Sequence, residues 1–198
     1  MAQASYSTSV SAQSSAVVFT DEATSTIDNI SYQITNAAKR IWDYATALVV
    51  EDGGSPTVES YTVNGLNGTV TFESADAGRV ITVTGAYVVL TTLATAKDFA
   101  LTSDLTLADT TPLGQQFSVF TPTTLTGSIT LGRYDLADST FADMLLAGDV
   151  KVINYTSESS EPEWLAYAIA NSDAYSTAIG GVGEESISFN ITRKMILE

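Results

Sequence analysis

Residues 99–107 have the sequence Phe-Ala-Leu-Thr-Ser-Asp-Leu-Thr-Leu, in which apolar and small or polar side chains alternate. This period of two residues is typical of a strand that buries one face and leaves the other in water. Three further stretches show the same period, with apolar side chains at Ile81, Val83, Tyr87 and Val89, at Leu125, Ile129 and Leu131, and at Ile187, Phe189 and Ile191. The opposite faces are rich in Ser and Thr. The sequence therefore predicts an antiparallel β-sheet with one solvated face.

A hairpin is predicted between two short alternating stretches. The dipeptide Asn-Gly occurs at 64–65 and again at 67–68, and it tolerates the positive φ angles that tight hairpin turns require. We therefore expect strands near 57–63 and 69–73.

A second strand pair is predicted at 150–155 and 163–170, on either side of a turn-like run. The apolar side chains of this pair occupy both faces of the predicted strands. This pattern indicates a pair that is covered on both faces or packed in an interface.

One short helix is predicted late in the chain. Asp138 or Ser139 can cap its start, Gly148 can end it, and Phe141, Met144 and Leu145 form an apolar stripe between them. Residues 36–47 are ambiguous, because their apolar side chains recur at helical spacing while the flanking residues are strand-like.

The predicted fold is mainly β: an antiparallel β-sandwich or partly closed barrel with one short flanking α-helix and a long loop. Residues 1–16 lack periodicity and are predicted to be a flexible arm. Residues 17–90 form a β-rich N-terminal part, as a small subdomain or decoration, and residues 91–198 form the sandwich core. Residues 108–122 are the long loop, and long loops inside compact domains are usually functional.

Composition excludes several classes of function. The 198 residues include no His and no Cys, with 8 basic and 23 acidic side chains and a formal net charge of −15. The chain therefore lacks the residues for His- or Cys-based catalysis, thiolate zinc sites and disulfides. The acidic charge opposes binding to nucleic-acid phosphates. No apolar run is long enough for a membrane span and no secretory signal is visible, so no membrane partner is expected.

Carboxylates remain the main candidates for chemistry, and none lies in a catalytic motif. Asp28, Glu73 and Asp76 lack the spacing of a calcium loop, and Gly180-Gly181-Val182-Gly183 lacks the Lys of a phosphate-binding loop. We expect no catalytic residue, no metal and no cofactor, and we expect that the protein is not an enzyme. The paired acids considered are Glu51 with Asp52, Glu161 with Glu163, and Glu184 with Glu185.

The order of several segments resembles the major tail proteins, or tail tube proteins, of long-tailed, siphovirus-like bacteriophages. These segments are Leu93-Ala-Thr-Ala-Lys-Asp-Phe-Ala-Leu-Thr-Ser-Asp-Leu, Leu125-Thr-Gly-Ser-Ile-Thr-Leu, Ser139-Thr-Phe-Ala-Asp-Met-Leu-Leu-Ala-Gly and Val182-Gly-Glu-Glu-Ser-Ile-Ser-Phe-Asn. Upstream, Tyr32-Gln-Ile-Thr, Lys39-Arg-Ile-Trp-Asp, and Tyr61-Thr-Val-Asn followed by Gly68-Thr-Val-Thr-Phe look like the N-terminal part that some of these proteins carry. The resemblance covers roughly residues 17–192.

The resemblance implies a β-sandwich protomer that closes into homo-hexameric rings, which stack into a tube with an acidic lumen. The partners would be further copies of the chain and other tail proteins at the tube ends, and DNA would pass without specific binding. The location would be the virion tail, after synthesis in the host cytoplasm. The long loop would contact an adjoining ring through Thr111, Pro112, Leu113, Phe117 and Phe120, and Trp164 and Tyr167 would be interface aromatics.

Two other functions are compatible with the residues alone. A β-sandwich adhesion or carbohydrate-binding module would also use Ser/Thr-rich faces and Tyr rings. A small enzyme with two catalytic carboxylates would need a concave pocket and a carboxyl group with a raised pKa.

Overall fold

The structure of the protein is a computed structural model. It describes residues 9–76, 78–93, 98–109, 120–134, 139–156, 162–176 and 183–197.

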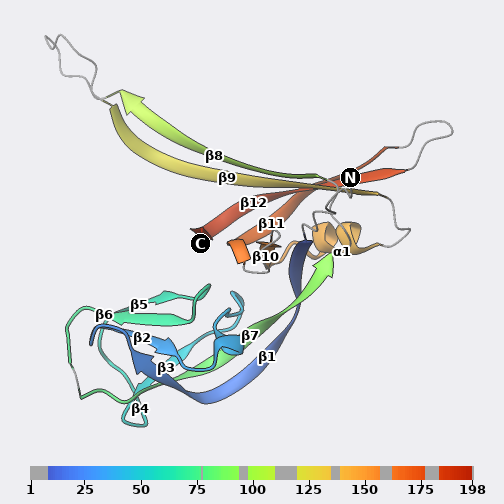
Figure 1. The fold of residues 1–198 in the computed structure, drawn as a ribbon. Coiled ribbons are helices and arrows are strands. Elements are labelled where there is room, and N and C mark those ends of the chain that lie inside the picture. The colour runs from blue at the N-terminus through green and yellow to red at the C-terminus, as the bar shows by residue number, and fades with distance from the viewer. Residues whose placement is uncertain are drawn as a thin grey trace, which may run out of the picture. The chain divides into compact units, whose positions relative to one another are not determined.

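Within this part of the chain, long antiparallel strands dominate and one α-helix is present (Figure 1). The predicted mainly antiparallel β fold with one short helix is confirmed, and the described sheets remain open rather than closing into a barrel. The elements are β1 (Ser9–Thr26), β2 (Ser31–Ile34), the 3-10 helix η1 (Ala37–Lys39), β3 (Val49–Asp52), β4 (Ser55–Pro56), β5 (Tyr61–Asn64), β6 (Thr69–Phe72), β7 (Ile81–Leu93), β8 (Asp98–Asp109), β9 (Phe120–Tyr134), α1 (Thr140–Ala147), β10 (Val150–Thr156), β11 (Pro162–Ser176) and β12 (Glu184–Leu197).

The chain divides into two compact units. The first holds residues 1–94, 150–167 and 193–198, and the second holds residues 95–149 and 168–192. Strand β11 therefore begins in the first unit and ends in the second.

Strand β1 organises the first unit. It pairs antiparallel with β10 at its start, with β7 along most of its length and with β2 at its end. Register shifts interrupt the β1–β7 pairing between Gln13 and Ser15 and between Phe19 and Glu22, and Asp21 has a positive φ of 49°. Irregularities of this kind increase the bend of a strand. β1 thus takes part both in the sheet with β7, β3 and β4 and in the smaller sheet of β2, β6 and β5.

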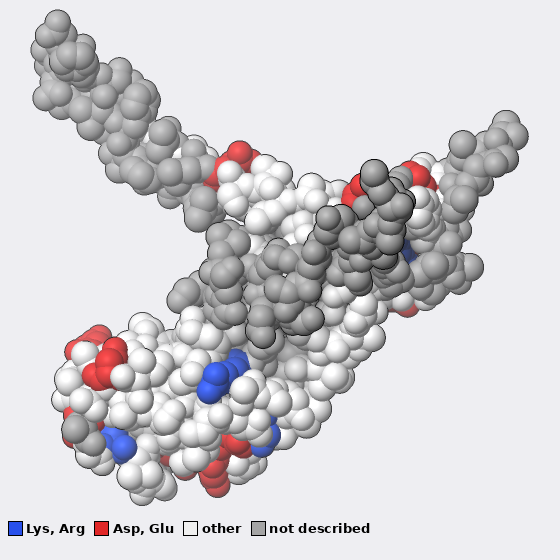
Figure 2. All heavy atoms as spheres, viewed as in Figure 1, with Lys and Arg blue, Asp and Glu red and all other residues white. Residues whose placement is uncertain are grey.

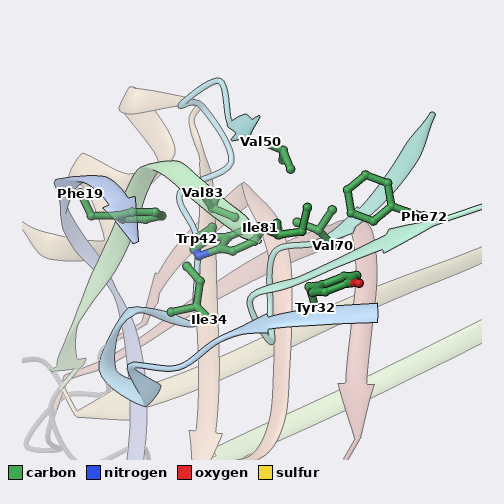
Figure 3. Packing of buried hydrophobic residues seen from close by; sticks show 9 residues of the cluster. All are labelled: Phe19, Tyr32, Ile34, Trp42, Val50, Val70, Phe72, Ile81 and Val83. Carbon is green, nitrogen blue, oxygen red and sulfur yellow. The ribbon is translucent and has the colours of Figure 1, made fainter. Parts of the chain in front are cut away.

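The two sheets of the first unit share one hydrophobic core. Phe19 of β1, Tyr32 of β2, Phe72 of β6 and Val83 of β7 are each at most 4% exposed. Figure 3 shows side chains from these strands gathered in one cluster that also includes the Trp42 indole. Burial of large apolar side chains from both layers holds a sandwich together.

Residues 9–16 are part of β1, whereas the sequence predicts a flexible arm over residues 1–16. Val10 and Ala12 are each 1% exposed, and this segment pairs with β10 on one side and β7 on the other. The first unit also extends beyond the expected N-terminal part, because β10 returns from residues 150–156 to pair with β1. Residues 1–8 lie outside the described residues.

The ambiguous segment 36–47 forms neither a long helix nor a regular strand. Asn36 caps the single turn of η1, where its side chain accepts a hydrogen bond from the backbone N–H of Ala38 at 3.1 Å. Trp42 then bonds to the backbone of Gly65 and forms an isolated bridge with Tyr87. Long-range backbone contacts decide the structure here.

The second unit contains an antiparallel sheet in the order β11-β12-β9-β8, with α1 beside it. Its buried side chains come from β9, β12 and the β11 residue Ala168, and the helix contributes Phe141, which is 2% exposed. The guanidinium carbon of Arg133 lies 4.0 Å from the centre of the Phe141 ring. The predicted helix is confirmed: it runs over Thr140–Ala147, with Gly148 in the left-handed conformation as C-cap. Ser139 occupies the N-cap position, but its hydroxyl donates to the Asp143 carboxylate at 2.7 Å instead of accepting from the helix backbone.

Replacing Gly148 with Ala should destabilise the protein by about 1–2 kcal/mol, the cost of holding an L-residue in the left-handed conformation. The residue has φ 62° and ψ 14°, and a Cβ there would meet nothing within 4 Å, so the cost comes from the backbone alone. The urea unfolding midpoint measures the effect. Gly148→Asn is the matched control, because Asn tolerates this conformation. Equal losses in both variants would contradict the explanation.

Candidate functional site

Strands β8 and β9 form a long antiparallel ribbon in the second unit. Its register runs from Asp98 opposite Gly132 to Asp109 opposite Phe120, with one irregularity between Thr106 and Leu107. The loop predicted at 108–122 is therefore shorter, because residues 108–109 continue β8 and residues 120–122 belong to β9. Residues 110–119 connect the strands and lie outside the described residues.

Strand β8 is an edge of its sheet. Among the described strands only β9 pairs with it, and β8 is 12 residues long. Alternate backbone N–H and C=O groups along its other edge therefore face away from the sheet. Its side chains include the exposed Asp98 and Asp104, while Phe99 is half-buried opposite the buried Leu131.

The residues predicted for ring stacking fall mostly outside the described part. Thr111, Pro112, Leu113 and Phe117 lie among residues 110–119, and Phe120 begins β9 but its side chain is not described. Their role stays a prediction.

The predicted interface aromatics Trp164 and Tyr167 are buried within the protomer, at 2% and 6% exposure. Strand β11 lies between β10 and β12, which pair with its two edges. Residues 164–168 are all buried, so both faces of this part of the strand are covered as well. Tyr167 donates a hydrogen bond from its hydroxyl to the carbonyl oxygen of Trp42 at 2.8 Å. Of the two alternatives that the sequence left open, coverage on both faces describes this strand in the protomer.

A pocket of about 420 Å³ opens beside Tyr167 in the first unit. We call it the Tyr44 pocket, and its walls come from three parts of the chain. The segment after η1 supplies most of them, the β5–β6 hairpin supplies others, and β11 supplies Tyr167. The lining residues are Trp42, Asp43, Tyr44, Thr46, Leu48, Val63, Asn64, Gly65 and Tyr167.

Backbone hydrogen bonds fix the pocket walls. The N–H of Trp42 donates to the carbonyl of Gly65 at 2.7 Å, and the N–H of Asp43 donates to the carbonyl of Ala86 at 2.9 Å. Gly65 has no side chain where Tyr167 approaches, and a Cβ at this position would clash with the Tyr167 hydroxyl. Glycine is therefore required for this approach.

The described acids that were considered for catalysis lie in two places, one in each unit, and in the second unit Glu184 and Glu185 line a pocket together with Asp98. Glu51 and Asp52 lie in β3, and Glu185 forms a buried ion pair with Arg133 in the second unit, with the Arg133 Nε and a Glu185 carboxylate oxygen 2.7 Å apart. Glu161 and the side chain of Glu163 lie outside the described part. Among the described residues, no group of three or more acids is placed to hold a metal ion.

Asp28 has a structural use. One oxygen of its carboxylate accepts hydrogen bonds from the backbone N–H groups of Ser31 at 2.6 Å and Ile30 at 3.1 Å, which closes the turn between β1 and β2. These bonds, from Ser31 first and Ile30 second, lower the pKa of Asp28 below its ordinary value. A lowered pKa is the opposite of what a general acid needs at neutral pH.

Charged side chains are scattered over the face drawn in Figure 2. Most of its described surface is uncharged, and acidic side chains form small separate groups with a few basic side chains between them. In the described part of the chain, no helix has the length and hydropathy of a membrane-spanning segment.

No protein-family model matches the chain, and no curated protein matches its sequence. Two solved structures have a similar fold over part of it. One is described as the tail of an empty gene transfer agent particle with C6 symmetry: the TM-score is 0.48 at 12% identity, over 55% of this chain and 86% of that one. The other is from the virion of a native gene transfer agent particle: the TM-score is 0.47 at 12% identity, over 55% of this chain and 88% of that one. Over about half of its length, the chain is similar to chains of these gene transfer agent particles.

Proposed function

We propose that the chain is a structural protein of a virion tail, whose copies close into six-membered rings that stack into a tube for genome passage. Its partners are further copies of itself and other tail proteins at the tube ends. The protein performs no chemistry in this role and needs no cofactor. The proposal rests on the order of motifs that resembles major tail proteins, and on one structural observation, the position of the long strand β8 at the end of the strand order among the described strands.

The edge of β8 favours self-association. A strand of 12 residues at the end of the described strand order can serve as a template for a strand of another molecule. Exposed acidic side chains on β8, including Asp98 and Asp104, oppose unspecific pairing between free protomers. In a closed ring, each copy covers the β8 edge of its neighbour, so that no copy keeps this edge exposed.

The connection between β8 and β9 is proposed to join successive rings. The two strands stay paired as far as Asp109 and Phe120, so residues 110–119 follow directly from a paired ribbon. This segment contains Pro112, Leu113 and Phe117, side chains that bury apolar surface on contact with a second molecule.

The net charge fits a conduit for DNA. A protomer with a formal charge of −15 repeated around a ring repels phosphate groups, so the genome slides without binding. The same charge makes free protomers repel one another until salt screens them, and assembly should therefore increase with ionic strength.

Replacing residues 110–119 with Asn-Gly tests the proposal. This turn closes a tight hairpin after the Asp109–Phe120 pair and leaves the described strands in place. We expect the unchanged chain to form rings or tubes in negative-stain electron microscopy as salt is raised, and we expect the variant to stop at rings or protomers. Circular dichroism should show the same β content and a similar melting temperature.

Two further variants make the result specific. Changing Pro112, Leu113 and Phe117 together to Ser keeps the loop length and should also prevent stacking. Val58→Ser, at a fully exposed valine of the first unit, should leave assembly unchanged. Tubes formed by the Asn-Gly variant would show that the loop does not join rings. Absence of rings and tubes from the unchanged chain at every salt and protein concentration would count against the tube itself.

A further inference from the structure

We propose that the Tyr44 pocket binds a neutral saccharide, through one sugar ring held between aromatic and hydrogen-bonding walls. Every lining residue of the pocket belongs to the first unit, whereas the contacts proposed for rings and tubes belong to the second. The inference is therefore independent of tube formation. Its volume of about 420 Å³ lies in the range of small-molecule sites, roughly 300–1,000 Å³.

Aromatic rings provide the apolar wall. The Tyr44 ring is 39% exposed, and its centre lies 5.6 Å from that of the Tyr167 ring, at an interplanar angle of 56°. Tyr167 is held in turn by its hydrogen bond to the Trp42 carbonyl. A partly exposed ring supported by a fixed ring offers a rigid face for the C–H groups of a sugar, at little cost in side-chain entropy.

Hydrogen-bond acceptors provide the polar wall. One oxygen of the Asp43 carboxylate accepts from the Gln13 amide at 2.6 Å, and the other accepts from the Thr46 hydroxyl at 2.7 Å. These bonds fix the carboxylate and leave it further lone pairs, since an ionised carboxylate offers about four acceptor positions. Asn64 also lines the pocket, and its Oδ1 is buried without a hydrogen-bond partner among the described residues. A buried acceptor without a donor is costly, and a ligand hydroxyl would supply the donor.

The charge of the walls selects against anions. The lining residues, all of them described, include one carboxylate and no Lys or Arg. A phosphate or a sugar acid would approach Asp43 without a compensating cation, which is unfavourable. A neutral polyol has hydroxyl donors for Asp43 and Asn64 and an apolar face for Tyr44, so a saccharide fits better than an anionic or a purely apolar ligand.

Saturation-transfer difference NMR on the full chain at low salt, where protomers repel one another, tests the proposal. The probes are glucose, galactose, mannose, N-acetylglucosamine and maltose, with glucuronate as the anionic probe and phenol as the apolar probe. We expect saturation transfer to at least one neutral sugar, with a dissociation constant of about millimolar, and weaker transfer to glucuronate. Tyr44→Ala should weaken binding about tenfold or more, and Asn64→Leu should do the same.

Matched controls separate binding from folding. Tyr175→Ala removes an exposed tyrosine of the second unit, 59% exposed, and should leave sugar binding unchanged. Each variant is compared by its melting temperature, and Tyr44→Phe, which keeps the ring, should retain binding. The proposal is overturned by the absence of transfer to all neutral sugars, by equal binding of Tyr44→Ala, or by preference for glucuronate. Binding of phenol alone would indicate a site for an aromatic side chain of a protein partner and would also overturn it.

Discussion

Glu185→Leu should lower the free energy of unfolding by about 3–5 kcal/mol, because it removes the carboxylate partner of a buried guanidinium. The Arg133 and Glu185 side chains are 3% and 10% exposed, and they face each other across the β9–β12 pair. Two Arg133 nitrogens reach the same carboxylate oxygen, at 2.7 Å and 2.6 Å. The loss should appear in urea unfolding at neutral pH as a lower midpoint.

The double variant Arg133→Met, Glu185→Leu is the control for this pair. It replaces both charges by apolar groups of similar length, and such replacements are often neutral or stabilising. We therefore expect the double variant to be more stable than Glu185→Leu alone. A single variant as stable as the unchanged protein would show that the guanidinium is adequately solvated without the carboxylate.

Trp42→Ala should cost about 3–5 kcal/mol, the range for removing a buried aromatic side chain from a core. Trp42 is 1% exposed, its ring centre lies 6.4 Å from that of Phe19, and its indole N–H donates to the Lys39 carbonyl at 2.9 Å. The substitution leaves a cavity in the core of the first unit and removes this hydrogen bond.

Urea unfolding followed by circular dichroism measures this loss, since the signal does not depend on the deleted indole. Trp42→Phe keeps most of the buried ring, and its loss of stability should be well under half of the loss in Trp42→Ala. Equal midpoints for Trp42→Ala and Trp42→Phe would show that the loss does not come from the cavity.

The strands and the helix were predictable because their signals are local. Alternation at 99–107 and 187–191 reports a half-buried strand, and the helix has a cap residue, an apolar stripe and a terminating Gly148 within ten positions. The hairpin strands 61–64 and 69–72 follow from their Asn-Gly turns in the same way.

Features that depend on distant contacts were not predictable. Residues 9–16 are mostly small or polar, and their strand forms because β7 and β10 pair with both of its edges. The Tyr44 pocket joins Asp43, Asn64 and Tyr167, which are far apart in the sequence, and no spacing rule brings them together. The pairing of Glu185 with Arg133 likewise depends on the register of two strands that are 52 positions apart.

The pairing of β1 with β10 also sets the order in which the protein folds during synthesis. Ala12 pairs with Ile153, so β10 leaves the ribosome roughly 7–28 s after β1 at typical rates of translation. Throughout that interval the start of β1 lacks one of its neighbours, and an unpaired strand in a nascent chain is prone to aggregate. The stretch Ser11-Ala-Gln-Ser-Ser15 has few groups that would drive such aggregation. Its low hydrophobicity, which concealed the strand from the sequence, protects the nascent chain while it waits for its partner.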